Sequence, residues 1–341
     1  LEQVQGRSDE ALTFYRKAIA MKADVADYYL AASALWVTQG YPGRAVTLLQ
    51  SGIAKVDRPA ALYAAMATVE LNSGHLDAAD AILQRARTAV GDKPEIVVAM
   101  GLYLMTQGAD KAEQWYQEQL AQQPQAAGIY GALGNLYLRN GKSTEALTAF
   151  QRAVELEPAN GGHYVSLAGA QAAAKQIPDA MATLQQAIAI EPTLATAYAN
   201  LAGLYAQQQA WTEARAMYQR ALAVAPTNGL FYVQYAQFLV GRSEQEAANA
   251  QLAQADQLSS TAAMLISRAA LYGGLNRKPE AEKDLLLALQ KEPGNVDALL
   301  ALNRLYRDLG ETAKATGVLA KAMQLVPALG DETIPGVSKT N

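Results

Sequence analysis

Large apolar side chains recur along the chain in a fixed order, with small residues between them. The clearest copy of this pattern contains Tyr130, Leu133, Gly134, Tyr137, Gly141, Ala146, Phe150, Ala153 and Pro158. Spacings of three, four and seven residues place the apolar side chains on one face of a helix, both before and after Gly141. The pattern therefore predicts two helices joined by a short turn.

This pattern repeats with a regular period, which prolines mark most clearly. The prolines that share one place in it are Pro124, Pro158, Pro192, Pro226, Pro293 and Pro327. The first four follow one another at intervals of 34 residues, and so do the last two. The 67 residues between Pro226 and Pro293 equal two periods with one residue deleted. A period of this length predicts an array of one repeated helical unit rather than separate domains.

Together, the pattern and the period resemble the tetratricopeptide (TPR) repeat. The resemblance covers residues 1 to about 327. It implies an all-α, right-handed TPR superhelix, an α-solenoid of antiparallel helix pairs. Nine full repeats are expected over residues 26–327, beginning near residues 26, 60, 93, 127, 161, 195, 229, 262 and 296. Residues 1–25 are expected to be the second half of a truncated repeat, with the N-terminus a cut, and residues 328–341 a flexible C-terminal tail.

Each place in the repeat has a structural reason. Small residues at the eighth and twentieth places, such as Gly134 and Ala146, let the two helices approach closely. The fifteenth place carries glycine in several repeats, where a turn can use the left-handed conformation. Four repeats have other residues there: Lys175, Gln209, Ser243 and Asn276. Asparagine tolerates that conformation best, so we expect the other three turns to be looser or of another type.

Composition narrows the classes of function. Hydrophobic residues make up 51% of the 341 residues and charged residues 18%, which predicts a folded chain. The net charge of −4 argues against nucleic acid as a partner, and no apolar run is long enough to span a membrane. The sequence contains no cysteine, which suits an oxidising periplasm but leaves the cytoplasm open. The Ala- and Gln-rich composition points to a bacterial protein.

No catalytic signature is found. The two histidines, His75 and His163, are 88 residues apart, and phosphate-loop, dinucleotide-binding and hydrolase motifs are absent from the sequence. We therefore expect no catalytic residue, cofactor or metal site, and no enzymatic activity.

The concave face implied by the TPR resemblance is the expected binding surface. In TPR families it is lined mainly by the first helix of each repeat, and the corresponding places in this chain are mostly small or apolar. The residues predicted to form the partner-binding groove are Val97, Leu104, Asn135, Leu138, Arg139, Val165, Asn200, Val233 and Gln237. The apolar members would form a strip and the polar members would orient a partner, unless neighbouring first helices cover the strip.

These observations favour a protein-interaction scaffold that holds an extended or helical segment of a partner with apolar anchors. One alternative is a TPR accessory region of a larger enzyme or export assembly, such as a glycosyltransferase or a polysaccharide-export protein. The other is a self-assembling array that associates through exposed ends. The apolar side chains expected at those ends are Phe14, Tyr15, Ile19, Val318, Leu319 and Met323.

Overall fold

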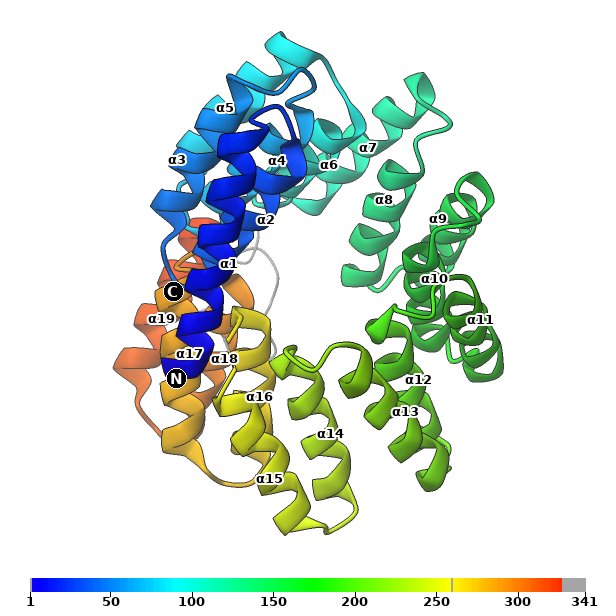
Figure 1. Ribbon diagram of the computed structural model, residues 1–341. Coiled ribbons are helices and arrows are strands. Elements are labelled where there is room, and N and C mark those ends of the chain that lie inside the picture. Colours follow the sequence, from blue (N-terminus) through cyan, green and yellow to red (C-terminus); the bar gives the residue numbers. More distant parts are fainter. Residues whose placement is uncertain (1, 259, 327–341) are drawn as a thin grey trace, which may run out of the picture. The chain divides into compact units, whose positions relative to one another are not determined.

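First and second helices alternate along the chain after an N-terminal helix, α1 (Glu2–Met21). The computed structural model describes residues 2–258 and 260–326, and these ranges contain α-helices and no β-strand (Figure 1). The predicted tail, residues 328–341, lies outside the described residues.

Nine helix pairs follow α1 in the described ranges. The first helices are α2 (Ala26–Thr38), α4 (Ala60–Asn72), α6 (Pro94–Met105), α8 (Ala127–Arg139), α10 (Gly161–Ala173), α12 (Ala195–Gln207), α14 (Gly229–Gly241), α16 (Ala262–Gly274) and α18 (Val296–Asp308). The second helices are α3 (Pro42–Ile53), α5 (Leu76–Val90), α7 (Ala109–Gln122), α9 (Ser143–Leu156), α11 (Ile177–Ile190), α13 (Trp211–Val224), α15 (Gln245–Asp256), α17 (Lys278–Lys291) and α19 (Thr312–Leu325).

Local hydrogen bonds hold the loops that lead from one pair to the next. Before α10, the Tyr164 hydroxyl donates to the Pro158 carbonyl at 3.2 Å. The Asn160 side chain accepts from the backbone N–H of Gly162 at 3.1 Å, which caps the helix. The loop before α14 is held in the same way. Each first helix of this kind therefore begins at a position set by its own loop.

The turns within the pairs correct one prediction from the sequence. The four non-glycine residues at the turn place have φ between 58° and 62°, the same left-handed region as Gly141 at 71°. They are Lys175, Gln209, Ser243 and Asn276. Lysine, glutamine and serine are thus not in looser or different turns, because the close packing of the two helices fixes the path of the chain between them. The backbone N–H of Gln176, for example, bonds the Gln171 carbonyl at 2.8 Å, as Lys142 bonds Tyr137.

Alanine at the twentieth place brings the two helices of each pair together. All nine of these alanines are buried: Ala45, Ala79, Ala112, Ala146, Ala180, Ala214, Ala248, Ala281 and Ala315. The eighth place is equally tight in the fourth pair, where a Cβ on Gly134 would lie 2.8 Å from the Phe150 ring. Small residues at these two places therefore set the distance between helices.

Charged and tyrosine side chains form hydrogen bonds between one helix pair and the next. Glu113 on α7 accepts from Lys142, the residue before α9, at 2.8 Å and from the Tyr137 hydroxyl on α8 at 3.2 Å. The charges are reversed where Arg215 on α13 donates to Glu244, the residue before α15, at 2.7 Å. Glu113 and Arg215 occupy the same place in their repeats, and so do Lys142 and Glu244. The ion pair is therefore kept at the same position, with the acidic and basic residues exchanged.

The described chain forms two compact units. One contains residues 113–258, and the other combines residues 2–112 with residues 260–326. The boundary falls within α7. In the second unit, the buried core of the first pairs includes Tyr29, Leu49, Leu62 and Met66. In the first unit, one core is built from α10, α11 and α12 around Leu184.

Candidate functional site

An open-sided cavity of about 560 Å³ lies in the unit of residues 113–258. Three successive first helices, α10, α12 and α14, form most of its wall, and Leu184 and Tyr218 reach it from the second helices. The α10 side is made of small residues, among them Ala168 and Gly169. None of the 14 lining residues is charged.

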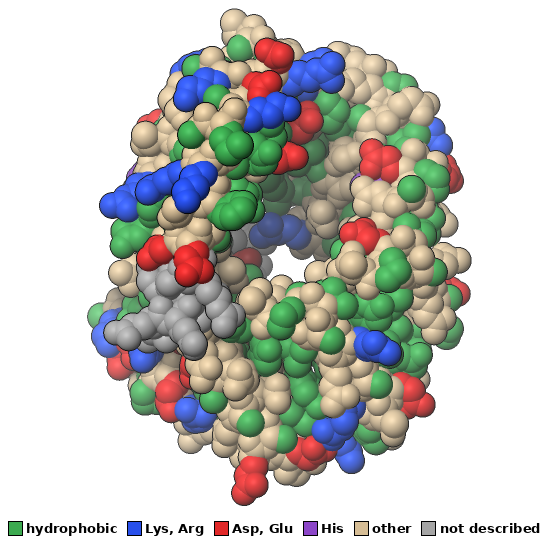
Figure 2. All heavy atoms as spheres, viewed as in Figure 1, with side chains coloured by type: hydrophobic (Ala, Val, Ile, Leu, Met, Phe, Trp, Pro, Cys, Tyr) green, Lys and Arg blue, Asp and Glu red, His purple; other side chains and the backbone are tan. Residues whose placement is uncertain are grey.

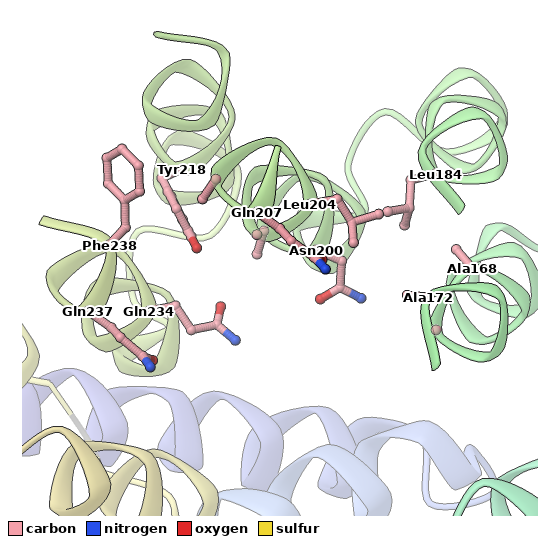
Figure 3. Close-up of a pocket in the computed structure, with 14 residues that line it drawn as sticks. Ala168, Ala172, Leu184, Asn200, Leu204, Gln207, Tyr218, Gln234, Gln237 and Phe238 are labelled. Atoms are coloured by element: carbon pink, nitrogen blue, oxygen red, sulfur yellow. The ribbon is translucent and has the colours of Figure 1, made fainter. Parts of the chain in front are cut away.

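Amide side chains supply the polar groups of this cavity. Asn200 and Gln207 come from α12, and Gln234 and Gln237 come from α14. Figure 3 shows the amides of Asn200, Gln207 and Gln234 and the hydroxyl of Tyr218 pointing into the same space. Asn200 and Gln237 are exposed, whereas Oε1 of Gln234 is buried and has no hydrogen-bond partner among the described residues. The site therefore offers both donors and acceptors without a charge.

Aromatic rings form the apolar wall at the α13–α14 end. The rings of Tyr218 and Phe238 lie 5.5 Å apart, and Tyr218 also stacks on Tyr235 at 5.5 Å. Burial raises the pKa of the Tyr218 hydroxyl, so this group stays protonated and can donate. Beside this cluster, Trp211 is 37% exposed with the Arg242 guanidinium 4.6 Å above its ring. The wall is fixed by its own stacking contacts.

The structure brings only two of the predicted groove residues to this cavity, Asn200 and Gln237. Leu104, Leu138 and Val165 are half-buried, and Asn135 and Arg139 are exposed on α8 outside the cavity lining.

Two of the predicted groove residues need a correction. Val97 and Val233 are buried, with 0% and 1% of their surface exposed, so they do not belong to an open apolar strip. First helices of neighbouring repeats pack on each other, as α4 does on α6 and α12 on α14, and in these two places the packing covers Val97 and Val233. Val97 and Leu104 also lie in the unit of residues 2–112 and 260–326, whereas the other predicted groove residues lie in the unit of residues 113–258.

Several residues of the cavity are not predicted from the sequence. Gln207, Gln234, Tyr218 and Phe238 line it but were not among the predicted groove residues. The signal was present in the sequence, since amides stand at the sixth place in Asn200 and Gln234 and at the thirteenth in Gln207. Aligning the amide positions of adjacent repeats identifies these residues.

Family models match parts of the chain. The model described as "Cilia and flagella-associated protein 70 middle TPR-like domain" matches residues 103–212, and the model described as "Tetratricopeptide repeat" matches residues 197–230 and 298–333. The chain is a tetratricopeptide-repeat (TPR) protein. TPR arrays are protein-interaction scaffolds and are generally not enzymes, which agrees with the coarse function predicted from the sequence.

Solved structures support the same fold. A tetratricopeptide repeat protein from Parabacteroides merdae ATCC 43184 is 15% identical, with a TM-score of 0.51, and the match covers 71% of this chain and 96% of that one. Yeast Tom70 is 16% identical, with a TM-score of 0.50, covering 95% of this chain and 82% of that one. At such identities the likeness shows the fold alone, and the predicted all-α TPR solenoid is confirmed. No curated protein matches the chain.

The histidines of this TPR protein pair with nearby glutamates. Nδ1 of His75 lies 2.6 Å from Glu70, and Nε2 of His163 lies 2.9 Å from Glu157. Hydrogen bonds from His163 and Asn160 lower the pKa of the Glu157 carboxyl. Within residues 2–258 and 260–326, no group of three or more His, Cys, Asp or Glu side chains could hold a metal ion.

On the face drawn in Figure 2, Lys and Arg side chains are interspersed with Asp and Glu side chains, so neither positive nor negative charge dominates this face. None of the helices in the described part of the chain is long and apolar enough to cross a membrane.

A second cavity, of about 400 Å³, lies between α16 and α18 in the other unit. It differs in charge, because Arg304, Asp297 and Asp308 line it together with apolar side chains such as Leu300. The uncharged lining therefore distinguishes the cavity of α10, α12 and α14 from this one.

The apolar side chains expected at the exposed ends of the array differ in how much of their surface is exposed. Phe14 is 78% exposed and Met323 is 37% exposed. Tyr15, Ile19, Val318 and Leu319 are half-buried. Self-association through the ends stays a prediction, as do the bacterial origin and the compartment.

Proposed function

We propose that this TPR protein binds an extended or helical segment of a partner protein in the cavity formed by α10, α12 and α14. The observation that carries the proposal is the uncharged lining, with four amide side chains among the residues that line a cavity of about 560 Å³. A peptide backbone has unpaired N–H and C=O groups in every residue, and an amide side chain can satisfy either one.

The lining also defines the chemistry of the partner. A charged side chain placed in the cavity would lose water without meeting an opposite charge, which is costly. An apolar side chain, in contrast, would pack on Leu184, Phe238 and the ring of Tyr218. The expected ligand is thus an uncharged segment with one or two apolar anchors, rather than an acidic or basic tail.

Filling the cavity tests this function. Gly203 lies on α12 in the cavity lining, and a Cβ added there would meet only the Tyr218 hydroxyl, at 4.0 Å. Gly203→Leu should therefore fit, and it should stabilise the helix by about 0.5–1 kcal/mol because leucine is the better helix former. Peptides selected from a displayed random library against the wild-type protein should bind this variant about tenfold more weakly or worse.

Gly317→Leu provides the matched control. Gly317 lies within α19, outside the cavity, and no atom lies within 4 Å of a Cβ built there. This variant should retain the affinity of the wild-type protein. Selected peptides that bind Gly203→Leu as tightly as the wild type, or that are rich in charged residues, would contradict the proposal.

A further inference from the structure

In the unit of residues 2–112 and 260–326, the loop between α17 and α18 lies against the ends of α2 and α4. The backbone N–H of Gly294 donates to the Asn72 carbonyl at 2.8 Å. Nζ of Lys291 donates to the Thr38 carbonyl, at the last residue of α2. Two hydrogen bonds thus join residues that are more than two hundred positions apart in the sequence.

The backbones meet so closely that position 294 admits only glycine. A Cβ on Gly294 would lie 2.6 Å from the backbone nitrogen of Gly74 and 2.7 Å from the Leu71 carbonyl oxygen. A Cβ on Gly74 would in turn lie 3.6 Å from Cα of Gly294 and 3.3 Å from Cδ2 of Leu325. Backbone atoms cannot swing away as a flexible side chain can. Any side chain at position 294 must therefore separate the two segments.

The loop itself does not require glycine. The φ angle of Gly294 lies outside the left-handed region that favours this residue. The residues that directly follow the proline in the equivalent loops after α7, α9, α11 and α13 are Gln125, Ala159, Thr193 and Thr227. Among these loops, glycine stands at this position only in the loop after α17, where the backbone of another segment packs against it. The contact, rather than the turn, accounts for it.

Lys291 departs from the pattern in the same way. It is the last residue of α17, whereas α9, α11 and α13 end in Leu156, Ile190 and Val224. Its ammonium group meets the C-terminal end of α2, where the helix dipole is negative and the last carbonyls lack partners within the helix. Burial lowers the pKa of Lys291, which shows that this side chain is partly withdrawn from water.

We propose that Gly74, Lys291 and Gly294 form an intrachain clasp that holds the helix pairs α2–α5 against the helix pairs α16–α19. The clasp is a conformational device independent of the proposed peptide groove, because none of its residues lines that cavity. Each hydrogen bond between loops contributes little net free energy. The clasp can therefore open while the helix pairs on both sides stay folded.

Distance measurements between spin labels test the clasp. The chain contains no cysteine, so Ala81→Cys on α5 and Lys283→Cys on α17 give two unique labelling sites, both exposed. Double electron–electron resonance on the full chain should give a single narrow distance distribution. Gly294→Ala, introduced into this labelled pair, should broaden the distribution and shift it to longer distances, with helicity unchanged by circular dichroism.

Two further variants complete the experiment. Lys291→Met removes the ammonium bond without a steric clash and should open the clasp in part, which covers the case that Gly294→Ala fails to fold. Thr227→Ala changes the same loop place in the other unit and should leave the distribution as it was. A narrow distribution that persists in both Gly294→Ala and Lys291→Met would overturn the proposal. So would a dipolar signal lost on dilution with unlabelled protein, because two copies would then share the contact.

Discussion

At the scale of the residue, the turn within each helix pair shows packing overriding local preference. Lys175, Gln209 and Ser243 adopt φ values of 60° to 62°, which L-residues rarely take. The left-handed conformation costs such residues about 1–2 kcal/mol each. The turn nevertheless keeps its geometry, since both helices are fixed by buried contacts on either side of it. These repeats therefore store strain that Gly141 avoids.

Relieving this strain should stabilise the protein. We expect Lys175→Gly to raise the free energy of unfolding by about 0.5–1 kcal/mol, the relief of strain less the entropy that glycine loses on folding. Urea denaturation of the full chain measures the change. Gly141→Ala is the mirror experiment and should lower the free energy of unfolding by a similar amount. A decrease for Lys175→Gly would show that the lysine side chain contributes more than its backbone costs.

At the scale of the element, the α8–α9 pair matches a small residue at the eighth place with a larger one at the twenty-fourth. Gly134 faces Phe150 in this way, whereas Ala168 and Leu184 occupy the same places in the next repeat. Phe150 is fully buried, and the approach of its ring leaves no room for a methyl group on α8. The two helices are thus fitted to each other residue by residue.

A double-mutant cycle measures this fit. Gly134→Ala alone should destabilise the α8–α9 pair by about 1–3 kcal/mol through overpacking, despite the higher helix propensity of alanine. Phe150→Leu alone should also destabilise, by leaving a cavity. The double variant reproduces the combination found at Ala168 and Leu184, so its loss should be smaller than the sum by about 1 kcal/mol or more. Additive losses in chemical denaturation would contradict the pairing.

At the scale of the whole molecule, stability is a sum of contacts between neighbouring repeats with one long-range addition. Within each compact unit, helix pairs pack on the pairs next to them in sequence. The exception within the described chain lies in the unit of residues 2–112 and 260–326, where Gly294 meets Gly74. A destabilising substitution should therefore lower the local stability of its own repeat and of the adjacent repeats, and leave distant repeats unchanged.

Hydrogen exchange can follow that spread. Tyr137 is 8% exposed and donates to Glu113, so Tyr137→Ala leaves a cavity and removes one hydrogen bond to this carboxylate. We expect a loss of about 3 kcal/mol or more in local stability. Amide exchange should become faster in α7–α10 and stay unchanged in α16–α19. Uniformly faster exchange would mean that the array unfolds as a single cooperative unit.

The sequence by itself determined the repeat, because apolar periodicity and small residues at fixed places encode contacts within a pair and between adjacent pairs. Such contacts are local in sequence, so Ala146 and Phe150 could be assigned to the core without coordinates. The sequence also predicted Asn200 and Gln237 as groove residues, and both line the cavity, although the sequence did not predict Gln234.

Only the tertiary structure decided which side chains remain open and which distant segments meet. Val97 and Val233 looked like groove residues until the packing of neighbouring first helices covered them. Lys175 looked unsuited to its turn until the helices on both sides imposed it. The meeting of Gly74 with Gly294 joins segments more than two hundred residues apart, and no single repeat encodes it. Burial and long-range contact are therefore properties of the assembled array, whereas the helix pair is a property of each repeat.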